Sequence, residues 1–316
     1  MWLGRHFGLK GGISRMDKIF TVTDLGDGLW EIADSVGCRC YLVKGSERVA
    51  LVDSCVGVGD LRPVVEGLAG GLPVTVLLTH RHHDHIAGSY LFDDVRIPRE
   101  EEVDLGVEEE QNLHARSFYV EQGRAPEGAF WAMSEGRRPN FSHFEEGDVL
   151  DLGGVTIEGY FLPGHTDHSI GYLLRERRLL LAGDAVTPCM CLFFPESLPI
   201  ADWRQTLDKM GEMPFDTFRI GHYSHEFTKD DLRGFIVAAD YALSGARGLS
   251  WMYTYIEGLK GSLYISPETP TDDADSPDFR AVIGPYVPRE HKRRRRRGTQ
   301  GAAAEGASGE ASGEER

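Results

Sequence analysis

The sequence predicts a mixed α/β fold in which strands predominate. Short apolar, β-branched segments bounded by Gly, Asp or Pro recur through the first 220 residues, and such segments are typical of strands. Apolar residues at helical spacing lie between some of them. With 316 residues, of which 41% are hydrophobic and 27% charged, the chain is long enough to bury a substantial core.

The predicted strands follow one another in order, each as a short apolar run. They are Ile19 to Val22, Tyr41 to Val43, Val49 to Val52, Val74 to Leu78, Val155 to Phe161, Gly171 to Leu174, Leu179 to Leu181 and Phe218 to Ile220. Apolar residues at i, i+3 and i+4 predict three helices, around Leu61 to Leu68, Trp203 to Met210 and Leu232 to Ala239.

Residues 100–148 interrupt this pattern with an acidic stretch, Glu100 to Glu110, followed by Gly and Pro. We interpret them as a helical or loop-rich insertion. Such insertions form either the wall of a pocket or a solvated surface helix, and the sequence favours neither.

The charge of the chain excludes one class of partner. Fifty Asp and Glu against 34 Lys and Arg give a net charge of −16, which repels phosphate backbones, so we expect no nucleic acid to bind the folded domain. The run Arg293 to Arg297 is interpreted as a solvated appendage on a flexible tail.

Composition also predicts where the protein resides. No apolar stretch approaches the ~20 residues of a membrane span, and the N-terminus lacks the apolar core of a signal peptide. The five cysteines are an odd number in a long chain, which does not suggest a secreted disulfide framework. We therefore predict a cytoplasmic protein with reduced thiols and no membrane partner. The pattern does not indicate the oligomeric state.

A dense cluster of histidines indicates a metal-binding site. His80, His82, Asp84 and His85 follow the apolar run Val74 to Leu78 within six residues. Imidazole nitrogens and carboxylate oxygens suit zinc and other first-row divalent ions. Two neighbouring metal ions could therefore share this loop, with further ligands supplied from elsewhere in the chain.

The same arrangement recurs three times. A predicted strand ends and a His or Asp follows beside glycine, which lets the backbone approach closely. These positions are His165, Asp184 and His222.

In these motifs the sequence resembles the metallo-β-lactamase fold hydrolases. The resemblance rests on the HxHxDH signature at His80, His82, Asp84 and His85, and on the Pro-Gly-His-Thr, Ala-Gly-Asp and Gly-His turns that contain the three later residues. It spans roughly residues 17–245. Asp53 also matches a family position, one that is usually structural.

The resemblance implies an αββα sandwich with the metals at one edge of its two central sheets. It assigns His80, His82 and His165 to the first metal and Asp84, His85 and His222 to the second, with Asp184 bridging both. It also implies that a bridging water, whose pKa falls towards about 7 between two divalent ions, attacks a carbonyl substrate as hydroxide. Zinc is the expected metal, with iron or manganese as alternatives.

Two residues near the motifs are further catalytic candidates beside Asp84. His168 follows the His165 turn, where the family often has Gly. It either hydrogen-bonds substrate, supports a metal ligand by contacting it, or faces solvent. Tyr223 follows His222, and its phenol either protonates a leaving group, stabilises an oxyanion, or simply packs as a core tyrosine. His83 points away from its neighbours and is not expected to be a ligand. The cysteines of Cys38-Arg39-Cys40 and Cys189-Met190-Cys191 are interpreted as buried or pocket-lining thiols.

The resulting domain prediction has three parts: residues 1–16 as an N-terminal extension, 17–265 as the catalytic domain, and 266–316 as a C-terminal segment, largely disordered from about residue 289. The predicted function is hydrolysis of a small thioester, lactone or related ester. The alternatives are a mono-iron oxidoreductase of sulfur compounds, a β-lactamase and a non-catalytic binding module.

Overall fold

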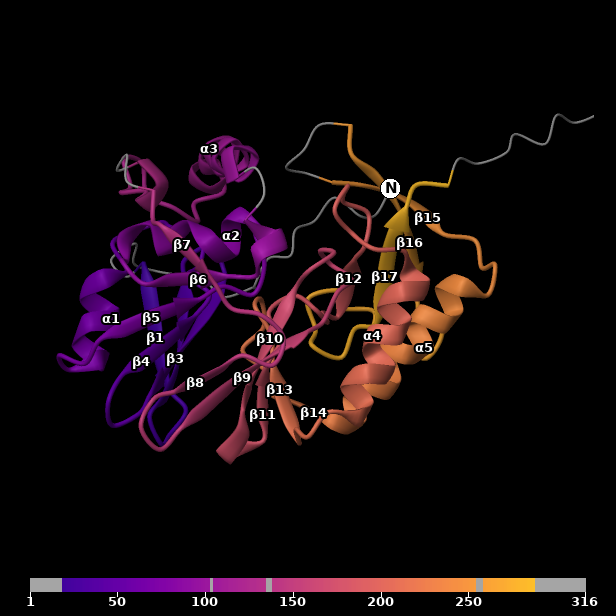
Figure 1. The fold of residues 1–316 in the computed structure, drawn as a ribbon. Helices are drawn as coiled ribbons and strands as arrows, with labels where there is room; N and C mark the ends of the chain where they lie inside the picture. Colours follow the sequence, from indigo (N-terminus) through magenta and orange to yellow (C-terminus); the bar gives the residue numbers. More distant parts are fainter. Residues whose placement is uncertain (1–18, 103–104, 135–137, 254–257, 288–316) are drawn as a thin grey trace, which may run out of the picture.

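Two β-sheets pack face to face at the centre of the protein, with helices on their outer faces (Figure 1). The computed structural model describes residues 19–102, 105–134, 138–253 and 258–287. The first sheet follows chain order, as β1 Phe20–Asp24, β2 Leu29–Asp34, β3 Arg39–Lys44, β4 Val49–Val52, β5 Val74–Leu77, β6 Val95–Ile97 and β7 Phe141–His143. Its first four strands are antiparallel, whereas β4 to β7 run parallel.

The second sheet has the order β14-β13-β11-β10-β9-β8. Its strands are β8 Val149–Asp151, β9 Thr156–Phe161, β10 Ile170–Leu174, β11 Leu179–Leu181, β13 Thr217–Arg219 and β14 Phe227–Thr228. Only β11 and β13 pair in parallel, so these two strands end at the same edge of the sheet.

Five α-helices complete the layers in the described part of the chain. They are α1 Arg62–Ala69, α2 His83–Ile86, α3 Leu105–Glu121, α4 Ile200–Glu212 and α5 Leu232–Leu243. Short 3-10 turns are η1 Ala87–Leu91, η2 Arg99–Glu101, η3 Ala132–Ser134, η4 Arg175–Arg177 and η5 Lys229–Asp231. Figure 1 shows α1 and α3 on the side of the first sheet and α4 with α5 on the side of the second.

Side-chain alternation along the central strands explains the layering. In β4, Val49 and Leu51 join the core under α1, whereas Ala50 and Val52 join the core between the sheets. In β11, Leu180 packs into the core under α4 and α5. Because successive side chains of a strand point to opposite faces, a continuous apolar strand is buried on both sides. The predicted αββα sandwich is confirmed.

All eight predicted strands and all three predicted helices are present, although α4 and α5 extend beyond their predicted ends. The pattern missed several strands, among them β7 inside the stretch interpreted as a helical or loop-rich insertion. It missed β2 because this strand carries Glu31 and Asp34 at buried positions. Glu31 lies 3.4 Å from the Arg39 guanidinium and 3.6 Å from that of Arg219, so its charge is balanced inside the protein. Predicting strands from alternating polarity assumes that charged residues are exposed. A strand with a buried ion pair is therefore not recognised.

A third, smaller sheet lies beside α5 and has the order β12-β17-β16-β15. Its strands are β12 Cys189–Cys191, β15 Leu249–Met252, β16 Lys260–Ile265 and β17 Ala281–Pro285. β17 pairs with β12 in parallel and with β16 in antiparallel fashion, so the structure joins residues 281–285 to the fold. The three-part domain division stays a prediction, and the proposed disorder from about residue 289 lies outside the described residues.

Among the described helices, none combines the length and apolar character that crossing a bilayer requires.

Candidate metal centre

The predicted ligands lie at strand ends that meet at one edge of the sandwich. The turn after β5 holds His80 and His82 and leads into α2, which carries Asp84 and His85. The turns after β9, β11 and β13 hold His165, Asp184 and His222. The first sheet therefore positions His80, His82, Asp84 and His85. The second sheet positions His165, Asp184 and His222.

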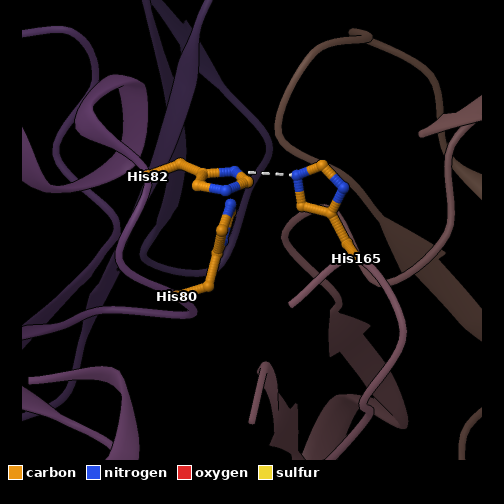
Figure 2. Close-up of side chains that lie close together, drawn as sticks. All are labelled: His80, His82 and His165. Atoms are coloured by element: carbon orange, nitrogen blue, oxygen red, sulfur yellow. Dashed lines mark hydrogen bonds between the residues drawn. The ribbon is translucent and has the colours of Figure 1, made fainter. Parts of the chain in front are cut away.

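His80, His82 and His165 form the first group (Figure 2). Their ligand nitrogens all lie within 4.8 Å of one another. His82 Nδ1 lies 2.9 Å from His165 Nε2, and His80 Nε2 is buried without a hydrogen-bond partner among the described atoms. Three imidazole lone pairs that converge on one point, one of them otherwise unsatisfied, fit a bound cation.

Asp84, His85 and His222 form the second group around Asp184. His222 Nε2 lies 3.0 Å from Asp184 Oδ2 and 3.5 Å from Asp84 Oδ2, and His85 Nε2 lies 3.6 Å from Asp184 Oδ2. The same Asp184 oxygen lies 3.8 Å from His165 Nε2 in the first group. One carboxylate therefore stands between two sets of donors. Its other oxygen, Oδ1, is buried without a partner among the described atoms, which also fits a cation.

Hydrogen bonds on the far side of each ring fix which nitrogen faces the centre. His85 Nδ1 lies 2.9 Å from Asp53 Oδ2, and His80 Nδ1 lies 2.9 Å from Thr79 Oγ1. Thr79 donates its own hydroxyl hydrogen to Asp53, so its oxygen can accept from His80. Asp53 thus has the structural place expected of it. Such outer contacts hold the tautomer and orientation that a metal ligand needs.

The other two rings of the first group are held by β12 and the segment that follows it. His165 Nδ1 lies 2.9 Å from the Cys191 carbonyl oxygen, and His82 Nε2 lies 2.6 Å from Glu196 Oε1. Both contacts leave the remaining nitrogen free to face the centre. Sequence reasoning missed Glu196, because 114 residues separate it from His82.

Burial keeps part of the first group uncharged. It lowers the pKa of His165 to about 4, with the nearby His82 charge acting in the same direction. Burial and the neighbouring histidines also hold the pKa of His80 well below its ordinary value. At neutral pH both rings therefore present lone pairs rather than protons, which is the form that binds metals.

In the second group, nearby carboxylates favour the protonated form of the imidazoles. Burial opposes protonation of His85, but the charges of Asp184, Asp53 and Asp84 raise its pKa well above the ordinary value. The pKa of His222 is raised in the same way, chiefly by Asp184. Protons on these rings neutralise the buried carboxylates. A cation bound between the same groups would replace these protons, since a ligand imidazole must be neutral.

The acidic insertion holds the ligand turns in place. Glu101, fully buried in η2, accepts hydrogen bonds from the Arg81 amide at 2.9 Å and from the Thr166 hydroxyl at 2.5 Å. Glu108, in α3, accepts from the His83 amide at 2.9 Å. The Glu101 carboxylate joins the turn after β5 to the turn after β9. The insertion is therefore in contact with the site.

The additional candidates, His168 and Tyr223, belong to none of the described groups of potential metal donors. His168 is partly exposed, with its ring in a T-shaped arrangement with Phe161 and its Nδ1 3.3 Å from Asp167 Oδ1. Tyr223 donates a long hydrogen bond of 3.5 Å to the Ala274 carbonyl, and burial raises the pKa of its phenol. Their catalytic roles stay predictions. His83 is buried beside Glu108, away from both donor groups.

One thiol approaches the centre more closely than expected. Cys38 Sγ lies 4.0 Å from Asp84 Oδ2 and forms a three-donor group with Asp84 and His222. The sequence indicated only that this cysteine is buried or lines a pocket.

The sequence profile of the Metallo-beta-lactamase superfamily matches residues 33–222, which is more than half of the chain and contains every predicted ligand. The chain belongs to the metallo-β-lactamase superfamily.

Two named relatives are similar to about 60% of this chain. The acyl-coenzyme A thioesterase MBLAC2 of Bos taurus is 27% identical over 208 residues, which cover 60% of this chain and 74% of the relative. The hydroxyacylglutathione hydrolase of Aeromonas hydrophila is 27% identical over 195 residues, covering 61% of this chain and 63% of the relative.

Solved structures agree on the fold. A metallo-beta-lactamase family protein from Thermus thermophilus has a TM-score of 0.50 at 21% identity, covering 71% of this chain and 85% of that protein. A metallo-beta-lactamase from Pontibacter korlensis has a TM-score of 0.51 at 14% identity, covering 70% of this chain and 99% of that protein. At these identities the similarity concerns the fold alone.

Proposed function

We propose that this superfamily member is a dinuclear, zinc-dependent hydrolase of small thioesters, lactones or related esters. The hydrolase class itself is confirmed by the superfamily match and by relatives named as hydrolases. The dinuclear part of the proposal depends on the position of Asp184 Oδ2. This atom lies between the two donor groups, at 3.0 to 3.8 Å from three imidazoles.

In this proposal His80, His82 and His165 hold the first ion, and Asp84, His85 and His222 hold the second, with Asp184 shared. The donor set of imidazole nitrogen and carboxylate oxygen suits zinc. When bound, a pair of divalent cations supplies Lewis-acid polarisation of a carbonyl and an acidified water at neutral pH. The protein contributes orientation, since Asp53, Thr79, Glu196 and the Cys191 carbonyl fix the ligand rings.

The surroundings of the first group support a substrate with an apolar part. The Phe194 ring lies 5.2 Å from His82 and 5.7 Å from His165 between ring centroids, and it packs against Phe193 and Tyr253. Aromatic surface beside the donors suits an acyl group better than a highly charged one.

Thioesters are the first choice within the class because two relatives are named for thioester chemistry, as an acyl-coenzyme A thioesterase and a hydroxyacylglutathione hydrolase. A lactone or ester presents a similar carbonyl. The small-molecule substrate is part of the proposal, while the cytoplasmic location and the exclusion of nucleic acid stay predictions.

A substrate screen tests the proposal. The purified chain is assayed for metal content, loaded with zinc, and given acyl-coenzyme A, acyl-glutathione, lactone, β-lactam and phosphodiester substrates. We expect thioester or lactone hydrolysis that chelation abolishes. Asp84→Ala should lower kcat/KM at least about a hundredfold, because an electrostatic contact to the reacting centre is lost.

Two controls make the result interpretable. His114→Ala removes an exposed histidine far from the donors and should leave the rate unchanged. One iron per chain together with oxidation of a sulfur compound would replace the proposal by the oxidoreductase alternative, and turnover confined to β-lactams would replace it by the β-lactamase alternative. Equal turnover by Asp84→Ala would support a non-catalytic site.

A further inference from the structure

Cys38 is held at a fixed position beside the second donor group. It lies directly before β3 and is only 4% exposed. Its amide donates to Asp34 Oδ1 at 3.0 Å, and its carbonyl accepts from the Asp34 amide at 3.0 Å and from the Cys55 thiol at 3.5 Å. These contacts use the backbone of Cys38 and leave its sulfur facing Asp84.

The sulfur, the Asp84 carboxylate and the His222 imidazole present one donor atom each, and the three atoms lie within 4.8 Å of one another. Around one tetrahedral zinc ion, with bonds of about 2.3 Å to sulfur and about 2.0 to 2.2 Å to nitrogen or oxygen, donor atoms are separated by roughly 3.3 to 3.7 Å. The 4.0 Å between Cys38 Sγ and Asp84 Oδ2 is close to this separation. The widest donor separation in the group is at most 4.8 Å, so it would shorten by at most about 1 Å for one cation to contact all three.

The backbone also couples Cys38 to His222. The Arg39 amide donates to the Gly221 carbonyl at 2.8 Å, and the Arg39 guanidinium donates to the His222 carbonyl at 2.7 Å. Arg39 is itself buried and lies 3.4 Å from Glu31. The residue next to Cys38 therefore ties the two donor-bearing segments together, so that the sulfur and the imidazole keep their relative placement.

Other thiols of the chain have different surroundings. Those of Cys40 and Cys55 lie 3.7 and 3.8 Å from the Ile32 carbonyl, and that of Cys191 lies 3.7 Å from the Cys189 carbonyl. Within the described ranges, Cys38 is the cysteine that belongs to a group of potential metal donors.

We propose that Cys38 is a thiolate ligand of the second metal ion, alongside Asp84 and His222. The inference rests on the proposed function, because it requires that this group binds a cation. On binding, the sulfur forms a bond to the metal and the thiol proton passes to solvent. A soft thiolate biases the site towards zinc, cobalt or iron(II) and against magnesium or manganese.

Cobalt substitution tests the proposal by a signal that does not depend on turnover. A thiolate bound to Co²⁺ produces an intense ligand-to-metal charge-transfer band in the near ultraviolet, which imidazole and carboxylate ligands do not produce. We expect the band in the cobalt-loaded protein and its loss in Cys38→Ser, with cobalt affinity at one of the two sites lowered roughly ten- to a hundredfold. Cys189→Ser is the matched control and should keep the band, because this buried thiol belongs to no described group of potential donors.

A second measurement needs no variant, in case Cys38→Ser fails to fold. X-ray absorption at the zinc edge of the zinc-loaded wild-type protein should require about one sulfur for every two zinc ions, the count that one thiolate per dinuclear site gives. Absence of sulfur scattering, or a charge-transfer band that persists in folded Cys38→Ser, overturns the ligand assignment while the hydrolase proposal stands. Failure to bind cobalt or zinc at all overturns both.

Discussion

At the scale of the residue, the centre depends on what holds each imidazole as much as on the imidazole itself. His82 is the clearest case. Burial opposes ionisation of Glu196, but the hydrogen bond and charge of His82 lower the pKa of this carboxyl to about 2. Glu196 is therefore an anion at any pH at which the protein would work, and it holds the hydrogen of His82 on Nε2.

Glu196→Gln tests this positioning role. An amide can still contact the ring, but it lacks the charge that fixes the tautomer, so affinity for the first metal ion should fall roughly ten- to a hundredfold. Competition with a chromophoric chelator measures this affinity. Glu66→Gln, on the exposed outer face of α1, is the matched control. Unchanged affinity in Glu196→Gln would show that burial alone orients His82.

At the scale of the element, a side-chain hydrogen bond joins the parallel strands β5 and β6 near one end. Thr75, in β5, donates its hydroxyl to Asp94 Oδ2 at 2.6 Å, just before β6 begins. Partial burial alone would raise the pKa of Asp94, but hydrogen bonds from Arg96 and Thr75 outweigh it and lower this pKa below its usual 3.8. The turn that carries the first histidines leaves β5 at its opposite end, so this contact supports the strand on which they depend.

Asp94→Asn should show a pH-dependent loss of stability. Since the folded-state pKa of Asp94 is depressed, the carboxylate contributes stability above pH 3.8, and that contribution disappears as the pH falls through the folded-state pKa. For a partly exposed group we expect a loss of up to about 1 kcal/mol at pH 7. Urea denaturation across this pH range measures it, with the exposed Asp272→Asn as control. A loss that does not diminish towards low pH would contradict the ionic origin.

At the scale of the whole molecule, the centre exists because two sheets approach each other closely at one edge. Gly183, in the turn after β11, makes this approach possible. Its φ of +54° is left-handed, and a Cβ there would lie 2.5 Å from Thr79 Oγ1 and 2.7 Å from Thr79 Cβ, in the turn after β5 of the other sheet. Thr79 has little freedom to move, since its hydroxyl and its amide both donate to Asp53.

Gly183→Ala should therefore push Asp184 away from the histidine turn. We expect a loss of at least about 2 kcal/mol of unfolding free energy, from overpacking and from the left-handed backbone, together with a lowered metal content. Gly211→Ala is the matched control, because Gly211 lies in α4 and a Cβ there would meet nothing within 4 Å. This variant should be neutral or gain up to about 1 kcal/mol. Denaturation curves and metal analysis of the two variants decide between the outcomes; equal curves would contradict the close-approach argument.

The sequence by itself determined the layers and the seven candidate ligands. A strand that is buried on both faces has a continuous apolar sequence, and a ligand placed directly after it keeps its position through covalent adjacency. His80, Asp184 and His222 were found in this way, although their roles as ligands stay a proposal. Charged Glu31 concealed β2, because the pattern cannot show that an arginine from another strand balances it.

Only the tertiary structure decided which groups surround those ligands. Cys38 meets Asp84 across 46 residues and Glu196 meets His82 across 114, and no periodic pattern encodes either contact. The pairing of β17 with β12 is equally remote in the chain. Local patterns reflect how each segment is buried, whereas these contacts arise when the two sheets and the third sheet pack together, and that packing sets the chemistry of the centre.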